Sequence, residues 1–200
     1  MMLTEQSAVS GAILPVQAMK DHLRLGTGFA DDGLQDALIE AHVRAAMAVI
    51  EARTGKCLLQ RRFLLRLAAW RDHGAGQSLP LAPIVAIHGV TLVDATGAET
   101  PVAPERYRLV PDAARPVLAG LGGGLPQIPA LGEARVEFDA GFGAGWSAVP
   151  PDLAQAVMLL AAEFYERRHE GGERVPGLPM TVQALIDPWR TVRVLRGVSL

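Results

Sequence analysis

Apolar positions recur at helical spacing in two segments of the first 58 residues. A short segment begins at Pro15, and a longer one is capped by Asp31 or Asp32 and ended by Gly55. We therefore expect two helices, preceded by a mobile arm before Ile13, where the sequence shows no period. The apolar face of the short helix would carry Val16, Met19 and Leu23, and that of the longer helix Leu34, Leu38, Ala41, Ala45, Ala48, Val49 and Ala52.

Between residues 59 and 147 the apolar positions alternate with polar ones instead. Residues 135–140 alternate strictly, residues 62–69 follow a period of two, and residues 84–93 form a further β-rich run bounded by prolines and a turn signal. Glycine and proline punctuate this whole middle section. The pattern predicts antiparallel strands, with residues 141–145 as a flexible joint through which the chain returns to helix.

The strongest helical signal lies at residues 151–168. Pro151 suits the first helical position, Asp152 adds a negative charge to the first turn, and Arg167 and Arg168 complement the dipole at the end. Apolar residues extend most of the way round this helix, so we expect it to be covered on more than one side. A short helical segment, residues 181–186, follows and is broken by Pro188.

These patterns predict an α+β fold, a bundle of about four helices interrupted by an antiparallel β insertion. The expected parts are residues 1–58, the N-terminal half of the helical part; residues 59–147, the β insertion; and residues 148–200, the C-terminal half of the helical part with a docking tail.

Composition and charge exclude several classes of protein. Half of the 200 residues are apolar, which is enough for a sizeable core, and the net charge of −2 gives no basic field that would hold nucleic acid. The single cysteine, Cys57, allows no intrachain disulfide and fits a reducing cytosol. No apolar run approaches the roughly 20 residues that cross a bilayer, so we expect no membrane association.

No motif predicts catalysis, a cofactor or a metal ion. The segment 141–146 lacks the third glycine of a dinucleotide fingerprint, and glycines 122–124 are not followed by the lysine of a phosphate-binding loop. Cys57 follows a helix C-terminus, where packing is a better interpretation than nucleophilic reactivity. Glu163, Glu166 and Arg167 have the spacing of a solvated charged stripe. We predict no catalytic, cofactor-binding or metal-ligating residues.

The end of the chain is unusual for a terminus, because it combines a tryptophan with aliphatic and arginine side chains. Such residues are enriched where partners dock. Two interpretations stay open: Trp189 folds back on the chain's own core, or this end binds a partner. The predicted partner-binding residues are Pro188, Trp189, Arg190, Val192, Arg193, Leu195 and Arg196.

The order and spacing of these segments resemble the head-to-tail connector (adaptor) family of tailed bacteriophages, including the adaptors of phage-derived gene transfer agents. The resemblance covers nearly the whole chain, although no single motif is specific. It rests on Leu14-Pro15-Val16, Ile50-Glu51-Ala52-Arg53-Thr54-Gly55, Leu79-Pro80-Leu81-Ala82-Pro83, Val136-Glu137-Phe138-Asp139-Ala140-Gly141-Phe142-Gly143, Val149-Pro150-Pro151-Asp152-Leu153, Phe164-Tyr165-Glu166-Arg167-Arg168 and Leu185-Ile186-Asp187-Pro188-Trp189-Arg190.

The resemblance implies a structural, non-enzymatic protein of a virion or gene-transfer-agent neck, assembled in the bacterial cytoplasm. It would form a homo-oligomeric ring, commonly of twelve copies, below the portal protein. There it would extend the channel for double-stranded DNA, which passes without sequence-specific binding, and would connect the capsid to a stopper or another tail protein.

A closed ring needs two different complementary faces on each subunit. Our candidates for these faces are the helices at residues 32–53 and 151–168. The predicted oligomer-interface residues are Leu153, Val157, Met158, Tyr165 and Arg167.

Two alternative functions remain at this point. One is another neck protein, such as a tail-completion or stopper protein. The other, from a different class, is a small cytosolic enzyme with a site between the helical part and the β insertion that uses His42, His73 or His88.

Overall fold

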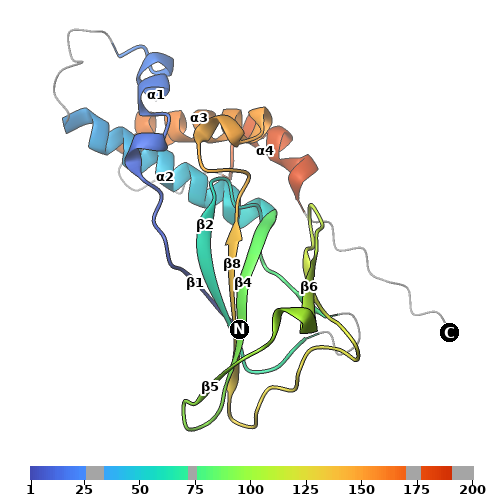
Figure 1. Ribbon diagram of the computed structural model, residues 1–200. Helices are drawn as coiled ribbons and strands as arrows, with labels where there is room; N and C mark the ends of the chain where they lie inside the picture. Colours follow the sequence, from blue (N-terminus) through green and yellow to red (C-terminus); the bar gives the residue numbers. More distant parts are fainter. Residues whose placement is uncertain (26–33, 72–75, 170–176, 191–200) are drawn as a thin grey trace.

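A computed structural model describes residues 1–25, 34–71, 76–169 and 177–190 of the chain. The fold is α+β: the α-helices gather at one end and antiparallel strands extend away from them (Figure 1). The α-helices are α1 (Val16–His22), α2 (Leu34–Thr54), α3 (Pro151–Glu166) and α4 (Met180–Ile186). Short 3-10 turns are η1 (Gly11–Ile13), η3 (Pro104–Arg106), η4 (Trp146–Ala148), η5 (Arg167–His169) and η6 (Asp187–Trp189).

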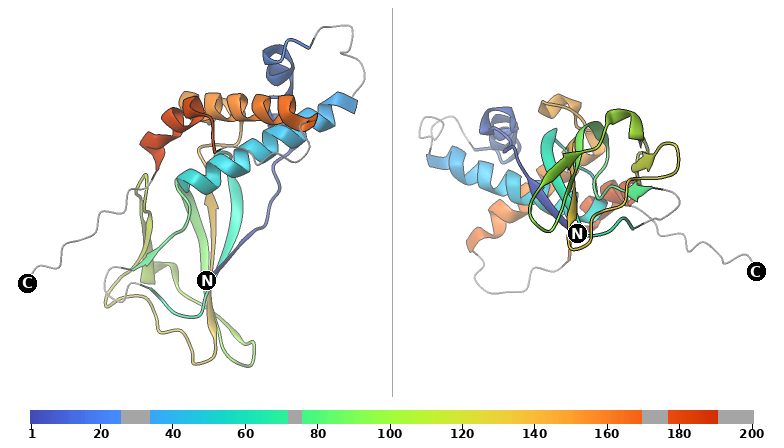
Figure 2. Two further views of the ribbon diagram at one scale, coloured as in Figure 1. Left: turned by 180° about the vertical axis from the view of Figure 1, so that it is seen from behind. Right: turned by 60° about the horizontal axis from the view of Figure 1, so that its bottom comes forward.

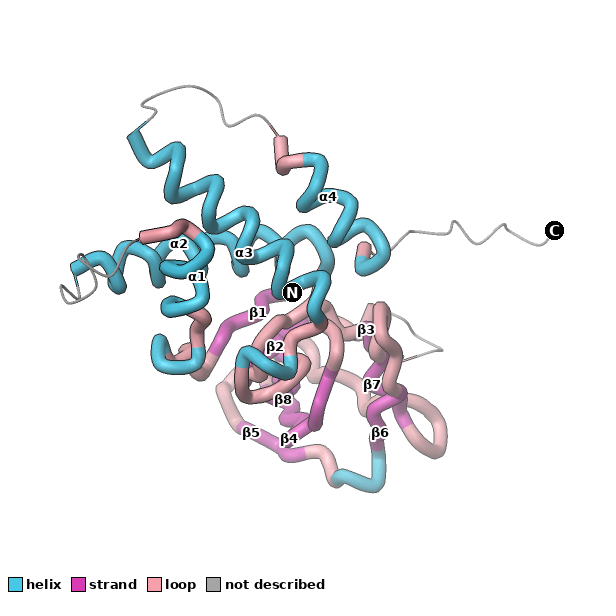
Figure 3. The backbone as a smooth tube through the Cα atoms, turned by 90° about the horizontal axis from the view of Figure 1, so that it is seen from above, coloured by secondary structure: helices cyan, strands magenta, loops and turns pink. Residues whose placement is uncertain are grey.

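Helix α3 is the centre of the helical layer, because α1, α2 and α4 all contact it. Viewed from above, α3 lies alongside both α2 and α4 (Figure 3). Pro151 occupies the first position of α3, as predicted, and Asp152 lies in its first turn. Cover on several sides explains how a helix that is apolar most of the way round can be stable in water.

The strands form two antiparallel sheets. The larger has the order β1 (Met2–Glu5), β2 (Arg61–Leu67), β8 (Glu133–Ala140), β4 (Ile84–Val93) and β5 (Glu99–Pro101). The smaller has the order β3 (Gln77–Ser78), β7 (Val117–Gly120) and β6 (Tyr107–Val110). The predicted strands at residues 62–69, 84–93 and 135–140 are confirmed as β2, β4 and β8 to within a few residues.

The buried apolar side chains divide into two clusters. One fills the helical layer and draws on α1 to α4 together with Leu58 and Leu59. The other lies on the inner face of the larger sheet, where Phe63 and Phe138 stack with ring centroids 5.8 Å apart, and it includes Leu118 of β7. The left view in Figure 2 shows the helices together at one end of the molecule and the strands extending away from them. The exact boundaries at residues 58/59 and 147/148 remain predictions.

The first residues of the chain are ordered, so the prediction of a mobile arm was wrong. Strand β1 pairs with β2 along its whole length, from Met2 opposite Arg66 to Glu5 opposite Phe63. The pairing continues beyond the strand, where the amide of Gln6 donates to the carbonyl of Arg62 at 2.8 Å. Four residues are too few to show a period, which explains why the sequence gave no signal.

Helix α2 buries a different face from the one predicted. Its core side chains are Ile39, Val43, Ala46, Met47 and Ile50, whereas Leu38 is 40% exposed and Ala41, Ala45, Ala48 and Ala52 lie on the surface. The sequence of α2 thus carries two apolar stripes, and the one with the larger side chains is buried because burial of apolar area is what stabilises the fold. The predicted caps, Asp31 and Asp32, lie outside the described residues.

The segment 141–145 is a fixed turn, so the prediction of a flexible joint was also wrong. The amide of Gly141 donates to the carbonyl of Pro83 at 3.0 Å, and the carbonyl of Gly143 accepts from the amide of Gln60 at 2.8 Å. Gly141 has a φ of 137°, and a Cβ at this position would lie 2.4 Å from the backbone nitrogen of Gln60. Glycine is therefore required for close approach of two backbones, and it does not loosen the chain here.

Candidate assembly surfaces

The described C-terminal end folds back onto α3. The indole Nε1 of Trp189 donates to Oδ2 of Asp152 at 2.6 Å, and its ring meets that of Phe142 edge-on at 5.6 Å. Of the two interpretations of Trp189, the structure therefore supports packing against the chain's own core, with the side chain half-buried there. Pro188 and Arg190 beside it are exposed, and Arg190 pairs with Asp187 at 3.2 Å. Val192, Arg193, Leu195 and Arg196 lie outside the described residues.

Burial corrects part of the predicted oligomer interface. Leu153 and Val157 have no exposed surface and Tyr165 is 9% exposed, because all three pack into the helical core. A side chain without exposed area cannot contact a neighbouring subunit, so burial argues against Leu153 and Val157 as interface residues, whereas Tyr165 keeps a small exposed area. Met158 is half-buried and Arg167 is exposed, where it pairs with Glu163 at 2.7 Å. For these two residues the interface remains a prediction.

An apolar groove opens on the helical layer between α2, α3 and the start of α4. Its volume is about 610 Å³. Met180, at the N-terminal end of α4, is 85% exposed at its edge. The groove is lined by Val49, Arg53, Leu160, Glu163, Phe164, Arg167, Gly177, Leu178, Pro179 and Met180. Most of the lining side chains are apolar, and three charged residues, Arg53, Glu163 and Arg167, line the same groove. We call it the α2–α3–α4 groove.

The exposed stripe of α2 lies directly beside this groove. Val49 and Arg53 of α2 line the groove. Ala45 and Ala52 lie four and three residues from Val49, and Ala48 lies four residues from Ala52. Residues at that spacing are surface neighbours. The groove and the stripe of Leu38, Ala41, Ala45, Ala48 and Ala52 therefore form one continuous apolar surface, which we call the helical face.

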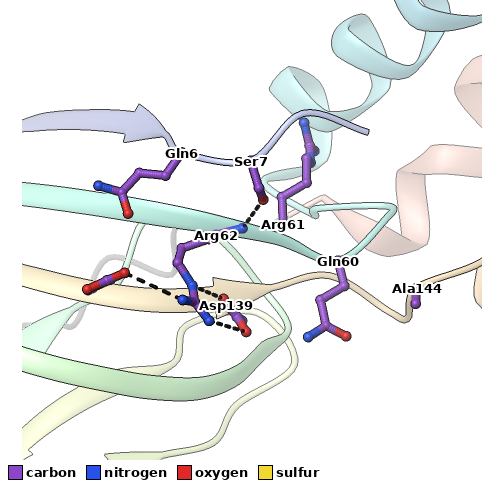
Figure 4. Close-up of a pocket in the computed structure, with 8 residues that line it drawn as sticks. Gln6, Ser7, Gln60, Arg61, Arg62, Asp139 and Ala144 are labelled. Carbon is purple, nitrogen blue, oxygen red and sulfur yellow. Dashed lines mark hydrogen bonds and ion pairs between the residues drawn. The ribbon is translucent and has the colours of Figure 1, made fainter. Parts of the chain in front are cut away.

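A second, polar depression of about 700 Å³ lies at the junction of β1, β2 and β8. Figure 4 shows the side chain of Arg62, on β2, reaching to Asp139 on the neighbouring strand β8. Nε of Arg62 lies 3.0 Å from Oδ1 of Asp139, and Nε2 of His88 lies 2.9 Å from Oδ2. The hydrogen bond from Arg62 holds the pKa of Asp139 below its usual range, with a smaller contribution from His88. Each of these three side chains thus has a partner, an arrangement that stabilises the sheet and activates no nucleophile.

Arg61, on the opposite side of β2, joins three parts of the chain. Its guanidinium pairs with Glu5 of β1 at 2.9 Å and with Glu51 of α2, and it donates to Sγ of Cys57 at 3.1 Å. Burial raises the pKa of the Cys57 thiol to about 12, against the opposing influence of Arg61. This supports packing over reactivity for Cys57, as predicted. Sequence reasoning missed Arg61, because its partners come from segments far apart in the chain.

The structure places His42 and His88 in different environments. His42 lies on α2 against Tyr165, with ring centroids 5.9 Å apart, while His88 belongs to the sheet network of Arg62 and Asp139. Burial, followed by the charge of Arg168, lowers the pKa of His42. His73 lies outside the described residues. Among the residues that the structure describes, no cluster of three or more potential ligands suits a metal ion, and no helix is long and apolar enough to cross a membrane.

Comparison with solved structures finds close relatives in particle necks. A chain from "Neck of empty GTA particle computed with C6 symmetry" is 56% identical, with a TM-score of 0.88 over 98% of this chain and 99% of that one. Chains from "Virion of native gene transfer agent (GTA) particle" and "Neck of native GTA particle computed with C12 symmetry" are 55% and 51% identical, with TM-scores of 0.85 and 0.83 and the same coverage. No protein-family model matches the chain, and no curated protein does.

Proposed function

Because this chain belongs to the head-to-tail connector (adaptor) family of gene transfer agent necks, we propose that it is the adaptor that forms a ring directly below the portal. The chain is a structural component of the particle neck and not an enzyme, and it forms a homo-oligomeric ring there. The observation that carries the proposal is sequence identity above 50% over 98% of the chain.

In the proposed ring, twelve copies surround the channel through which double-stranded DNA passes. The twelvefold symmetry of one matching neck supports this copy number. A net charge of −2 suits a channel wall, because binding DNA by neutralising its phosphates requires a surplus of basic side chains. DNA would therefore slide past the ring without being held.

The portal would be bound by the C-terminal end of the chain, which includes the predicted residues Pro188, Arg190, Val192, Arg193, Leu195 and Arg196. The bond between Trp189 and Asp152 supports this arrangement, because it fixes the start of that end to the rigid helical layer. A docking segment held at its root loses less conformational entropy on binding than a wholly free one. The opposite end of the ring would offer a platform to a stopper or another tail protein.

The proposal is tested by mixing the purified protein with portal rings and imaging the mixture by electron microscopy. We expect one adaptor ring on one end of each portal. Protein that leaves portals bare at high concentration contradicts the proposal, and protein that binds only to portals already carrying another neck ring indicates a stopper instead.

A truncation that ends at Arg190 tests the docking end without removing Trp189. We expect the shortened protein to fold as before but to leave portals undecorated, as measured by the same imaging and by circular dichroism. A matched control removes residues 1–5, which include the edge strand β1. Unchanged decoration by the C-terminal truncation would assign portal binding to another surface.

A further inference from the structure

We infer that the helical face, formed by the α2–α3–α4 groove and the exposed stripe of α2, is one of the two lateral faces of the ring and receives a second copy of this chain. This inference rests on the proposed function only because it requires that the chain form a ring. The contact between neighbouring copies is assigned to surface residues of the helical face and no longer to the buried residues of α3.

The chemistry of the helical face favours a protein partner. Its groove of about 610 Å³ is lined mostly by apolar side chains, including Val49 and Phe164, and Met180 in this lining is 85% exposed. A methionine side chain is flexible enough to adapt to an opposing surface. Arg53, Glu163 and Arg167 add charged groups to this lining, and interfaces commonly combine apolar with polar and arginine side chains. Contiguous exposed apolar surface of this kind marks an interaction site.

The stripe on α2 adds a surface that another subunit can approach closely. Leu38, Ala41, Ala45, Ala48 and Ala52 follow the repeat of three and four residues with which one helix packs against another, over a length of about 21 Å. Alanine has no side chain to hold an approaching helix away, so backbones can come near each other.

In a ring, the partner that covers the helical face is a neighbouring copy of this chain. The relatives form necks of sixfold or twelvefold symmetry, and in such a ring every copy presents two unlike faces that fit each other. Elsewhere in the described part of the chain, the exposed large apolar residues lie in separate segments: Met1 and Met2 at the start of the edge strand β1, Val85, Leu121 and Leu131. The helical face has fewer residues than the ~20–30 that a standard interface uses on each side. It therefore suits the centre of a contact whose rim extends further.

Two charge insertions test the inference, A48E and M180E. Both sites are on the surface, where substitutions ordinarily change the stability of a monomer by less than ~0.5 kcal/mol. We expect each variant to keep the wild-type circular dichroism spectrum and melting temperature but to need at least ~10-fold more protein for half-assembly, measured by native mass spectrometry. Where rings form only on portals, the number of copies bound to each portal falls instead.

The matched control is L131E, at a leucine that is 95% exposed on a loop outside the helical face. It should assemble as the wild type does. The inference is overturned if A48E and M180E reach half-assembly at the same protein concentration as L131E. A variant that binds portals as single copies separates the two proposals, because portal binding then survives while the lateral contact is lost. Wild-type rings that ignore portals refute only the proposed position in the neck.

Mixing A48E with wild-type protein distinguishes unlike faces from like ones. With unlike faces, the variant still binds a neighbour through its intact second face, so added variant should halt ring closure and accumulate open arcs. A variant that leaves wild-type rings intact at equimolar ratio would show that the helical face does not lie between neighbouring copies.

Discussion

The indole of Trp189 and the carboxylate of Asp152 are joined by a hydrogen bond of 2.6 Å, although 36 residues separate them along the chain. The other oxygen of Asp152 accepts from the amide of Leu153 at 2.9 Å, in the first turn of α3. One carboxylate thus stabilises the start of the central helix and holds the end of the described chain in place.

Replacing Trp189 should weaken the fold in two steps. Trp189→Phe keeps an aromatic ring against Phe142 but removes the donor to Asp152, which should cost about 1–2 kcal/mol. Trp189→Ala also removes the ring, and because this side chain is only half-buried the loss should be about half of the ~3–5 kcal/mol of a core tryptophan. Urea unfolding followed by circular dichroism measures both, and equal midpoints for all three proteins would contradict the prediction.

Gly141→Ala should destabilise the protein by about 2–4 kcal/mol, because it combines an unfavourable φ of 137° with a clash against the backbone of Gln60. Gly145 is the matched control. It has a φ of −124°, and a Cβ there would meet nothing within 4 Å. Thermal unfolding should separate the two variants clearly. Similar melting temperatures would mean that the turn is flexible after all.

Cys57 should lower the stability of the protein at alkaline pH. The folded protein disfavours the thiolate, since burial raises the thiol pKa to about 12, whereas an unfolded chain ionises near the ordinary value. The unfolded state therefore loses a proton first, and the free energy of unfolding should fall by up to ~1.4 kcal/mol per pH unit above pH 9. Cys57→Ala should remove this slope in urea titrations between pH 8 and 11. A slope that persists in the variant would assign it to another group.

Asp139 should contribute stability that is lost in acid. Its pKa is depressed in the folded state by Arg62, so the contribution is complete above the ordinary carboxyl pKa near 3.9 and disappears as pH falls through the lower, folded value. Asp139→Asn should be less stable than the wild type at pH 7, and the difference should shrink toward pH 2. Acid titration followed by tryptophan fluorescence measures this. A difference that is constant with pH would rule out an ionic contribution.

Local patterns in the sequence were enough to predict the class of fold and the three longest strands, β2, β4 and β8. Strict alternation over residues 135–140 predicts β8, and the proline at residue 151 predicts the start of α3, because each signal reports a constraint on its own backbone. Features that depend on distant partners could not be predicted this way. The pairing of β1 with β2 and the contact of Gly141 with Gln60 are decided by tertiary packing.

The choice of the buried face of α2 shows the same limit on a smaller scale. Both stripes of the helix are apolar at helical spacing, so periodicity alone does not rank them. Side-chain volume ranks the two stripes, since isoleucine, valine and methionine fill a core that alanine would leave empty. Side-chain volume was also left out when residues were chosen for the assembly surfaces. Strongly apolar positions such as Leu153 are buried in the chain's own core.

The contacts of Arg61 have a mechanical consequence for a protein that joins two parts of a particle. A force that pulled the sheet away from the helices would load two contacts at the same time: the ion pair between Arg61 of β2 and Glu51 of α2, and the hydrogen bond between Ala82, which leads into β4, and Gly55, which follows α2. Bonds that are loaded side by side share the force and must break together, whereas bonds loaded one after another open singly. The junction between the two layers would therefore resist tension as a unit.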